Sequence, residues 1–261
     1  MLGIQSDGTL WSWGGSNVDN GQVSSQTSRI PRRIEGQEGA THIVAGYYVS
    51  MVINADKELS AFGSNQLGLL GNGSINSTSS PVSIAYDNEE NLKQWKSVSV
   101  GHEFAIALDA DNRAYTWGYS KSGSLGTGTL DRVYFPTAIL PSSGNTTWNL
   151  IVVNMDAAHV IAIDSRGYLH GWGANDKDQL GMSGAANQLA PIKLTAKGID
   201  GIRYISASSG LGFSVAVRED GTLWAWGDNT EGQLGIGIKG STYSKPQEVD
   251  MSKVTSRRAS P

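Results

Sequence analysis

The segment DGTLWAWGDNTEGQLGIG (residues 220–237) decides the fold, because its first half recurs four more times along the chain. Each copy has a polar turn followed by a short run that ends on an aromatic residue and a glycine. These pairs are Trp13-Gly14, Phe62-Gly63, Trp117-Gly118, Trp172-Gly173 and Trp226-Gly227. The aromatic residues follow one another at steps of 49, 55, 55 and 54 positions, a spacing that indicates a repeat architecture.

Each repeat is predicted to contain four short antiparallel strands. In the third repeat, Phe104–Leu108 alternates with a period of two, which is typical of a half-buried strand. Asp111 and the residue after it then supply the positive φ of a tight hairpin. An apolar run, Trp95–Gly101, precedes this pair, and the proline-led run Pro136–Ile139 fits an outer edge strand. Four-stranded units repeated at this spacing predict the blades of an all-β propeller.

The repeats divide the chain into five predicted blades within a single domain, 1–261. Their expected ranges are 1–35 plus 250–256, 40–85, 95–140, 148–195 and 202–250. We interpret the five aromatic-glycine pairs as structural, because a large side chain at one repeated position can fill the wedge between neighbouring blades.

Several loop motifs resemble the repeat of the RCC1 (regulator of chromosome condensation) family. They are GDNTEGQLGIG (227–237), GHEFAIAL (101–108), NQLGLLG (65–71), GSLGTG (123–128) and NDKDQLG (175–181). The first repeat departs from the pattern because it lacks the Leu-Gly pair, and the fourth has Asp156-Ala157 in place of Gly-His. The resemblance implies a propeller that binds other proteins, usually with seven blades.

The two ends of the chain suggest how five blades close. The first repeat begins at Leu2 without a leading strand, whereas Pro246–Thr255 matches an outer strand followed by the start of a leading strand. We therefore expect the N- and C-terminal strands to pair and close a five-blade ring. The alternative is an arc that a partner or another chain completes.

Composition and charge exclude several classes of function. The net charge of −4 lacks the basic excess of a nucleic-acid binder, and no apolar run approaches the length of a membrane span. The absence of cysteine excludes disulfides and thiolate metal sites. Because no signal peptide is visible, we expect a cytoplasmic protein or part of a particle assembled in the cytoplasm. We expect no catalytic residue, cofactor or metal, because no catalytic or metal-binding motif is present.

Candidate binding residues lie where the repeat departs from a purely structural pattern. Tyr47 and Tyr48 stand in the same register as His102 and Glu103, and these four residues are predicted to lie at the mouth of the channel. Loops on a rigid scaffold commonly carry binding residues. The alternatives are ordinary exposed tyrosines and a histidine with a structural hydrogen bond.

The function favoured by the sequence is a non-catalytic scaffold for protein–protein interaction, or a structural protein such as a surface or virion component within a larger assembly. Two alternatives remain open. One is a carbohydrate-binding propeller, and the other is an RCC1-type module for guanine-nucleotide exchange or chromatin association. The latter follows from the best-known member of the family that the repeats resemble.

Overall fold

The computed structural model describes residues 1–14, 28–46, 48–84, 94–139, 146–184 and 186–253. In these ranges the secondary structure consists of β-strands and one short 3-10 turn, Met251–Lys253. The strands are β1 (Leu2–Ile4), β2 (Leu10–Gly14), β3 (Ser28–Arg33), β4 (Ala40–Ala45), β5 (Val49–Asn54), β6 (Leu59–Gly63), β7 (Thr78–Ser83), β8 (Trp95–Val100), β9 (Phe104–Asp109), β10 (Ala114–Gly118), β11 (Val133–Ala138), β12 (Trp148–Val152), β13 (His159–Asp164), β14 (Leu169–Gly173), β15 (Gln188–Lys193), β16 (Tyr204–Ser209), β17 (Phe213–Arg218), β18 (Leu223–Asp228) and β19 (Thr242–Glu248).

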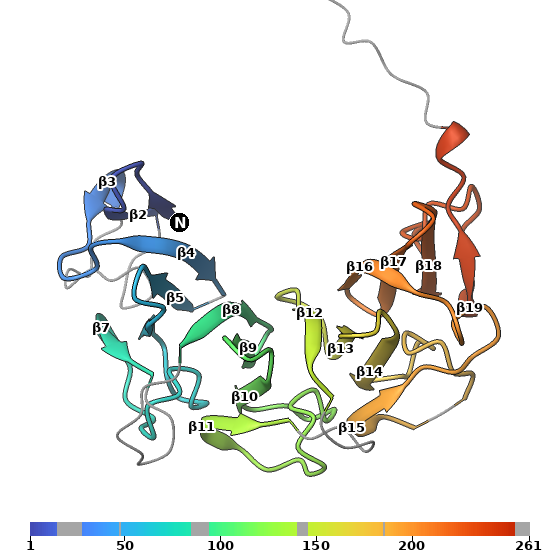
Figure 1. Cartoon of the computed structure of the whole chain (residues 1–261), viewed down its shortest axis with the longest axis horizontal. Helices are drawn as coiled ribbons and strands as arrows, with labels where there is room; N and C mark the ends of the chain where they lie inside the picture. Colours follow the sequence, from blue (N-terminus) through green and yellow to red (C-terminus); the bar gives the residue numbers. More distant parts are fainter. Residues whose placement is uncertain (15–27, 47, 85–93, 140–145, 185, 254–261) are drawn as a thin grey trace, which may run out of the picture.

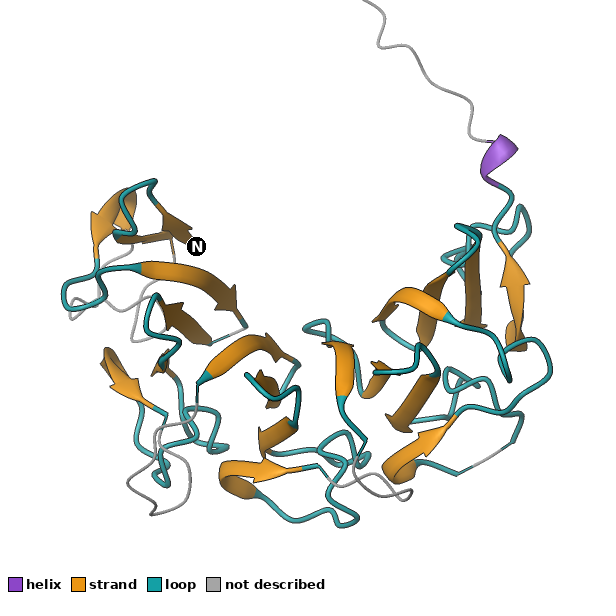
Figure 2. Cartoon of the chain, viewed as in Figure 1, coloured by secondary structure: helices purple, strands orange, loops and turns teal. Residues whose placement is uncertain are grey.

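The strands form five antiparallel sheets in chain order. The first sheet has three strands, β1-β2-β3, and the other four have four strands each: β4 to β7, β8 to β11, β12 to β15 and β16 to β19. In Figure 1 the first strands of the four-stranded sheets, β4, β8, β12 and β16, lie on the inner side of an arc, and β7, β11, β15 and β19 lie on its outer side. Figure 2 shows the same succession of sheets joined by loops. The all-β propeller class and the five repeats are confirmed.

The hairpin turns follow from their sequence. At the turn between the second and third strand of each repeat, one residue has a positive φ and donates its N–H to a carbonyl three residues earlier. These residues are Gly8, Lys57, Asn112, Gly167 and Gly221. Glycine and asparagine tolerate this left-handed conformation best, which is why the Asp-Gly and Asp-Asn pairs predicted the turns.

The outer strands begin earlier than their prolines suggest. Pro136 is the fourth residue of β11, and the register between β10 and β11 shifts between Thr116 and Gly118, opposite this part of the strand. The same shift occurs in the outer strand pair of every sheet. A bulge on an edge strand suits proline, because the residue has no N–H to donate to a ladder.

One repeated joint holds neighbouring sheets together. The indole Nε1 of Trp117, Trp172 and Trp226 donates to the carbonyl of Leu69, Ser124 and Gln179, respectively, in the loop of the preceding repeat, at 2.8–2.9 Å. These three tryptophans and Phe62 are fully buried, and the core divides into four clusters, one at each joint between successive sheets. Trp13 is only half-buried, because no described sheet covers the open side of the first sheet.

The prediction of a ring closed by its own termini is wrong. The first sheet does begin without a leading strand, as predicted, but β1 and the turn Met251–Lys253 lie on opposite arms of an open arc (Figure 1). The predicted closing segment, 250–256, contributes no strand up to Lys253, and its remainder lies outside the described residues. The physical reason is the packing between sheets: a buried cluster joins each sheet to the next, and the five sheets joined in this way trace an arc that does not complete a turn (Figure 1).

Candidate functional site

The strand order places two kinds of loop on the same face of the arc. Because each four-stranded sheet is an antiparallel meander, the loop between its first and second strands and the loop after its third strand open on one side. The hairpin turns lie on the opposite side. We call the first face the loop rim; along it lie Gly46, Tyr48 and the short loops at Gly101–Glu103, Val153–Ala158 and Gly210–Gly212.

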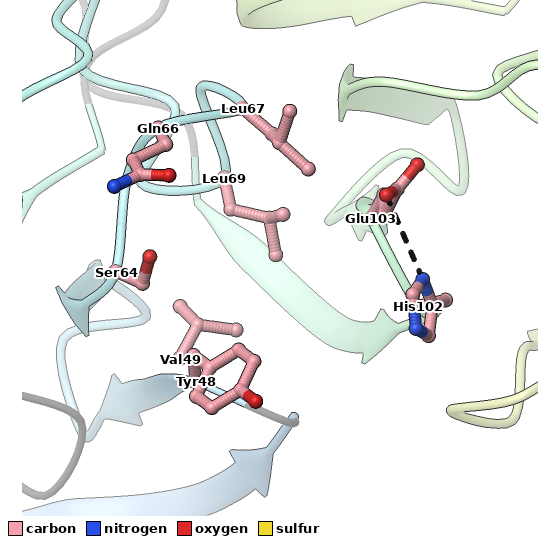
Figure 3. A pocket seen from close by; sticks show the side chains of 8 residues that line it. All are labelled: Tyr48, Val49, Ser64, Gln66, Leu67, Leu69, His102 and Glu103. Carbon is pink, nitrogen blue, oxygen red and sulfur yellow. Dashed lines mark ion pairs between the residues drawn. The ribbon is translucent and has the colours of Figure 1, made fainter.

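An apolar pocket of about 120 Å³ opens on the loop rim between the second and third sheets. Its lining residues are Tyr48, Val49, Ser64, Gln66, Leu67, Leu69, His102 and Glu103. Figure 3 shows Tyr48 and Val49 on one side, His102 and Glu103 on another, and the side chains of Leu67 and Leu69 above the opening. Tyr48 is 61% exposed, whereas Val49 and Leu69 are buried, so the pocket has an apolar floor and an exposed aromatic edge.

The repeat glycines hold the walls of this pocket in place. Gly63 and Gly118 follow the buried aromatic residues and have φ values of +123° and +100°. A side chain at Gly118 would lie 2.5 Å from the carbonyl oxygen of Glu103. The loop backbones are fixed by hydrogen bonds from the N–H of Ser64 to the carbonyl of Tyr48 (2.6 Å) and from the N–H of Tyr119 to the carbonyl of Glu103 (2.8 Å). The rim residues therefore stand on backbone that the sheet anchors.

The loop that carries Leu67 and Leu69 is held by a buried asparagine. Asn65 is fully buried; its Oδ1 accepts from the N–H of Leu70 at 2.8 Å and its Nδ2 donates to the carbonyl of Ser74 at 2.8 Å. Asn175 and Asn229 make the equivalent pair of bonds in their own repeats. The Asn…Leu-Gly motif is therefore a loop staple, and its glycine leaves room for the tryptophan of the next repeat: at Gly71 a Cβ would lie 2.9 Å from Trp117 Nε1.

A second pocket, of about 200 Å³, opens at the equivalent place between the third and fourth sheets. We call it the polar pocket because most of its residues are polar or charged; it is lined by His102, Glu103, Phe104, Tyr119, Ser120, Lys121, Ser122, Ser124, Asp156, Ala157 and Ala158. His102 and Glu103 line both pockets and so form the wall between them. Their side chains are 59% and 32% exposed, and His102 Nδ1 lies 3.8 Å from Glu103 Oε1.

The structure brings together three of the four residues that the sequence singled out. Tyr48, His102 and Glu103 line one pocket, and Tyr47 lies outside the described residues. Sequence reasoning missed Leu67 and Leu69, which belong to the RCC1-type loop motif, and Asp156, whose departure from Gly-His was the available signal. The wall of each pocket combines loops from two repeats, an arrangement that no single motif displays.

Among the described residues, no group of three or more histidine, aspartate or glutamate side chains is close enough to hold a metal ion. In the same part of the chain, no helix has the length and apolar character needed to cross a membrane.

The chain is similar to several curated proteins and spans only part of the two described next. It is 28% identical over 241 residues to the ultraviolet-B receptor UVR8 of Arabidopsis thaliana, and this match covers 90% of this chain and 52% of UVR8. It is 27% identical over 253 residues to the E3 ubiquitin-protein ligase HERC2 of Homo sapiens, covering 95% of this chain and 5% of HERC2.

Solved structures show the same fold. Human WBSCR16 superposes with a TM-score of 0.76 at 21% identity, covering 96% of this chain and 64% of that one. Prp20p from Saccharomyces cerevisiae superposes with a TM-score of 0.75 at 20% identity, covering 95% and 60%. Models of the regulator of chromosome condensation (RCC1) repeat match residues 58–108, 111–163, 166–217 and 220–259, and a second model of this repeat matches 95–124 and 204–233. The chain therefore belongs to the family of RCC1-repeat proteins.

Proposed function

We propose that this chain is a non-catalytic protein-binding module whose contact surface is the loop rim around Tyr48, His102 and Glu103. The observation that carries the proposal is the apolar pocket between two sheets, edged by exposed Tyr48 and by the pair of exposed His102 and half-buried Glu103. Aromatic residues in partly apolar pockets are typical of the centres of protein interfaces. The rigid backbone beneath these loops lowers the ordering cost of binding.

Protein partners are also named for a structure with this fold. The structure of Prp20p is described together with its binding to Gsp1p and histones. This supports a protein as the class of partner for the present chain, while the identity of the partner is left to experiment. Incorporation into a larger assembly is one form that such binding could take.

A histidine and a serine, residue types that serve in catalysis, are hydrogen-bonded to each other but lie in the core, away from any substrate. His159 and Ser214 are hydrogen-bonded to each other, but both side chains are fully buried at the joint between the fourth and fifth sheets. Ser214 directs its own proton to the carbonyl of Gln179, so the histidine does not act as a base toward this hydroxyl. The pair is explained by packing between sheets, which supports the non-catalytic proposal.

An affinity capture with matched variants tests the proposal. The baits are the wild-type chain, the rim variant Tyr48→Ala/Glu103→Ala, and the control Arg113→Ala. Arg113 is 61% exposed at a hairpin turn on the opposite face, where it lies 3.8 Å from Asp111, the same separation as the His102–Glu103 pair. We expect the captured proteins to be retained by the wild type and the control and lost from the rim variant.

Two outcomes would contradict this function. Identical captures on all three baits would show that the loop rim is not the binding surface. Stimulated nucleotide release from a captured GTPase would instead favour the exchange-factor alternative.

A further inference from the structure

The two pockets of the loop rim adjoin, and their linings differ in chemistry. His102 and Glu103 form the common wall, so a ligand that crosses this wall enters both pockets. The chemistry of the partner inferred from these linings rests on the proposed function of the rim.

The apolar pocket has the size of one side chain. Its volume of about 120 Å³ is somewhat below the ~150 Å³ of a cavity that accommodates benzene. Val49, Leu67 and Leu69 provide an aliphatic lining, and Tyr48 stands at its edge. An aliphatic side chain of a partner fits this space and these contacts.

The polar pocket carries more negative than positive charge. Glu103 and Asp156 bring two carboxylates to its lining, against the one ammonium group of Lys121 and the imidazole of His102, which lies 3.8 Å from Glu103 Oε1. A guanidinium or ammonium group entering the pocket would form charge-assisted hydrogen bonds with these carboxylates, whereas a carboxylate would be repelled. The charge therefore favours a basic side chain.

We propose that the loop rim binds one extended partner segment, which places an aliphatic side chain in the apolar pocket and a lysine or arginine side chain in the polar pocket. In an extended chain, residues i and i+2 point to the same side and lie about 7 Å apart. The segment crosses the wall formed by His102 and Glu103 between these two side chains. The recognised motif therefore combines an aliphatic and a basic residue on the same side of an extended segment, in either chain order.

Selection from a random octapeptide phage library against the immobilised full chain tests this motif. The best peptide is then labelled with fluorescein, and its affinity is measured by anisotropy. We expect enrichment of peptides that carry an aliphatic and a basic residue on the same side of an extended chain. Binding should weaken at least tenfold in Tyr48→Ala and in Glu103→Lys and stay unchanged in Arg113→Ala. Replacing the basic residue of the peptide by glutamate should restore binding to Glu103→Lys.

Three results would overturn the inference: no enriched peptide, enrichment of acidic peptides, or equal affinity for the wild type and both rim variants. These results are separable from a failure of the proposed function. If the protein capture still depends on Tyr48 and Glu103, the rim remains a binding surface, and only the proposed partner chemistry is wrong. If both assays fail, the rim itself is not the binding surface.

Discussion

His159 and Ser214 lie 55 positions apart in the chain, yet a hydrogen bond of 2.8 Å joins Nε2 to Oγ at the joint between the fourth and fifth sheets. Because the Ser214 hydroxyl donates to the carbonyl of Gln179 at 2.7 Å, the proton of the first bond belongs to His159 Nε2. Trp226 Nε1 donates to the same carbonyl at 2.9 Å. A polar chain thus links two sheets inside the core.

The buried histidine predicts a pH dependence of stability. Burial lowers the pKa of His159 from 6.5 to about 3, with Asp176 opposing the shift. Between these values the unfolded chain binds a proton that the folded chain excludes, so stability falls as the pH drops below 6.5. We expect His159 to account for a loss of about 2–3 kcal/mol between pH 7 and pH 4.5, measured by urea unfolding.

The matched variant for this experiment is His159→Phe, since phenylalanine occupies the equivalent first position of β9 and β17. It should remove most of the pH dependence while Ser214 keeps its bond to Gln179. A smaller dependence of stability on pH is expected to remain because of His170. Burial also lowers the pKa of His170, although its hydrogen bond to Asp164 opposes this shift. If the stability of His159→Phe still fell with pH as in the wild type, His159 would not be the cause of the pH dependence. The control is His42→Gln, because His42 is exposed.

The indole bond between sheets predicts a graded cost of substitution. Trp226→Phe keeps an aromatic ring, as Phe62 does in its own repeat, but removes the hydrogen bond to Gln179. We expect a loss of about 1 kcal/mol. Trp226→Ala also leaves a cavity and should cost about 3–5 kcal/mol. Thermal unfolding followed by circular dichroism measures both values, and a Trp226→Phe variant as stable as the wild type would show that the hydrogen bond contributes nothing.

The glycine beneath the loop rim predicts a sharp steric effect. In Gly118→Ala the new Cβ would lie 2.5 Å from the carbonyl oxygen of Glu103, in addition to the strain of φ +100°. We expect a loss of about 2–4 kcal/mol. Gly128 also has a positive φ, but its Cβ would meet nothing within 4 Å, so Gly128→Ala isolates the backbone strain at about 1 kcal/mol. Comparable losses in the two variants, measured by thermal unfolding, would exclude the steric explanation.

The asparagine staple predicts a loss of stability on truncation. Asn229 is fully buried, accepts from the N–H of Leu234 and donates to the carbonyl of Ile238. Asn229→Ala leaves these backbone groups without their partners and should cost about 1–3 kcal/mol. Asn76 is exposed, and Asn76→Ala should change stability by less than about 0.5 kcal/mol in the same urea titration. A neutral Asn229→Ala would contradict the staple.

The candidate site was only partly predictable from the sequence. Equivalent positions in the repeat placed Tyr48, His102 and Glu103 on matching loops, because strand alternation and turn position repeat with the motif. The aliphatic lining from Leu67 and Leu69 was not predictable, since these residues reach the pocket through a neighbouring loop of the same sheet. Asp156 comes from the next sheet along the chain, and its distance from Glu103 depends on the packing between sheets.

The sequence by itself determined the five repeats, their strand order and their hairpin turns, because alternation, glycine and proline act on the backbone over only a few residues. Only the tertiary structure decided whether the arc closes, where the pockets open and how His159 meets Ser214. These features depend on the rotation at each joint between sheets. That rotation comes from side chains about 50 positions apart packing together, and its effect accumulates from one sheet to the next.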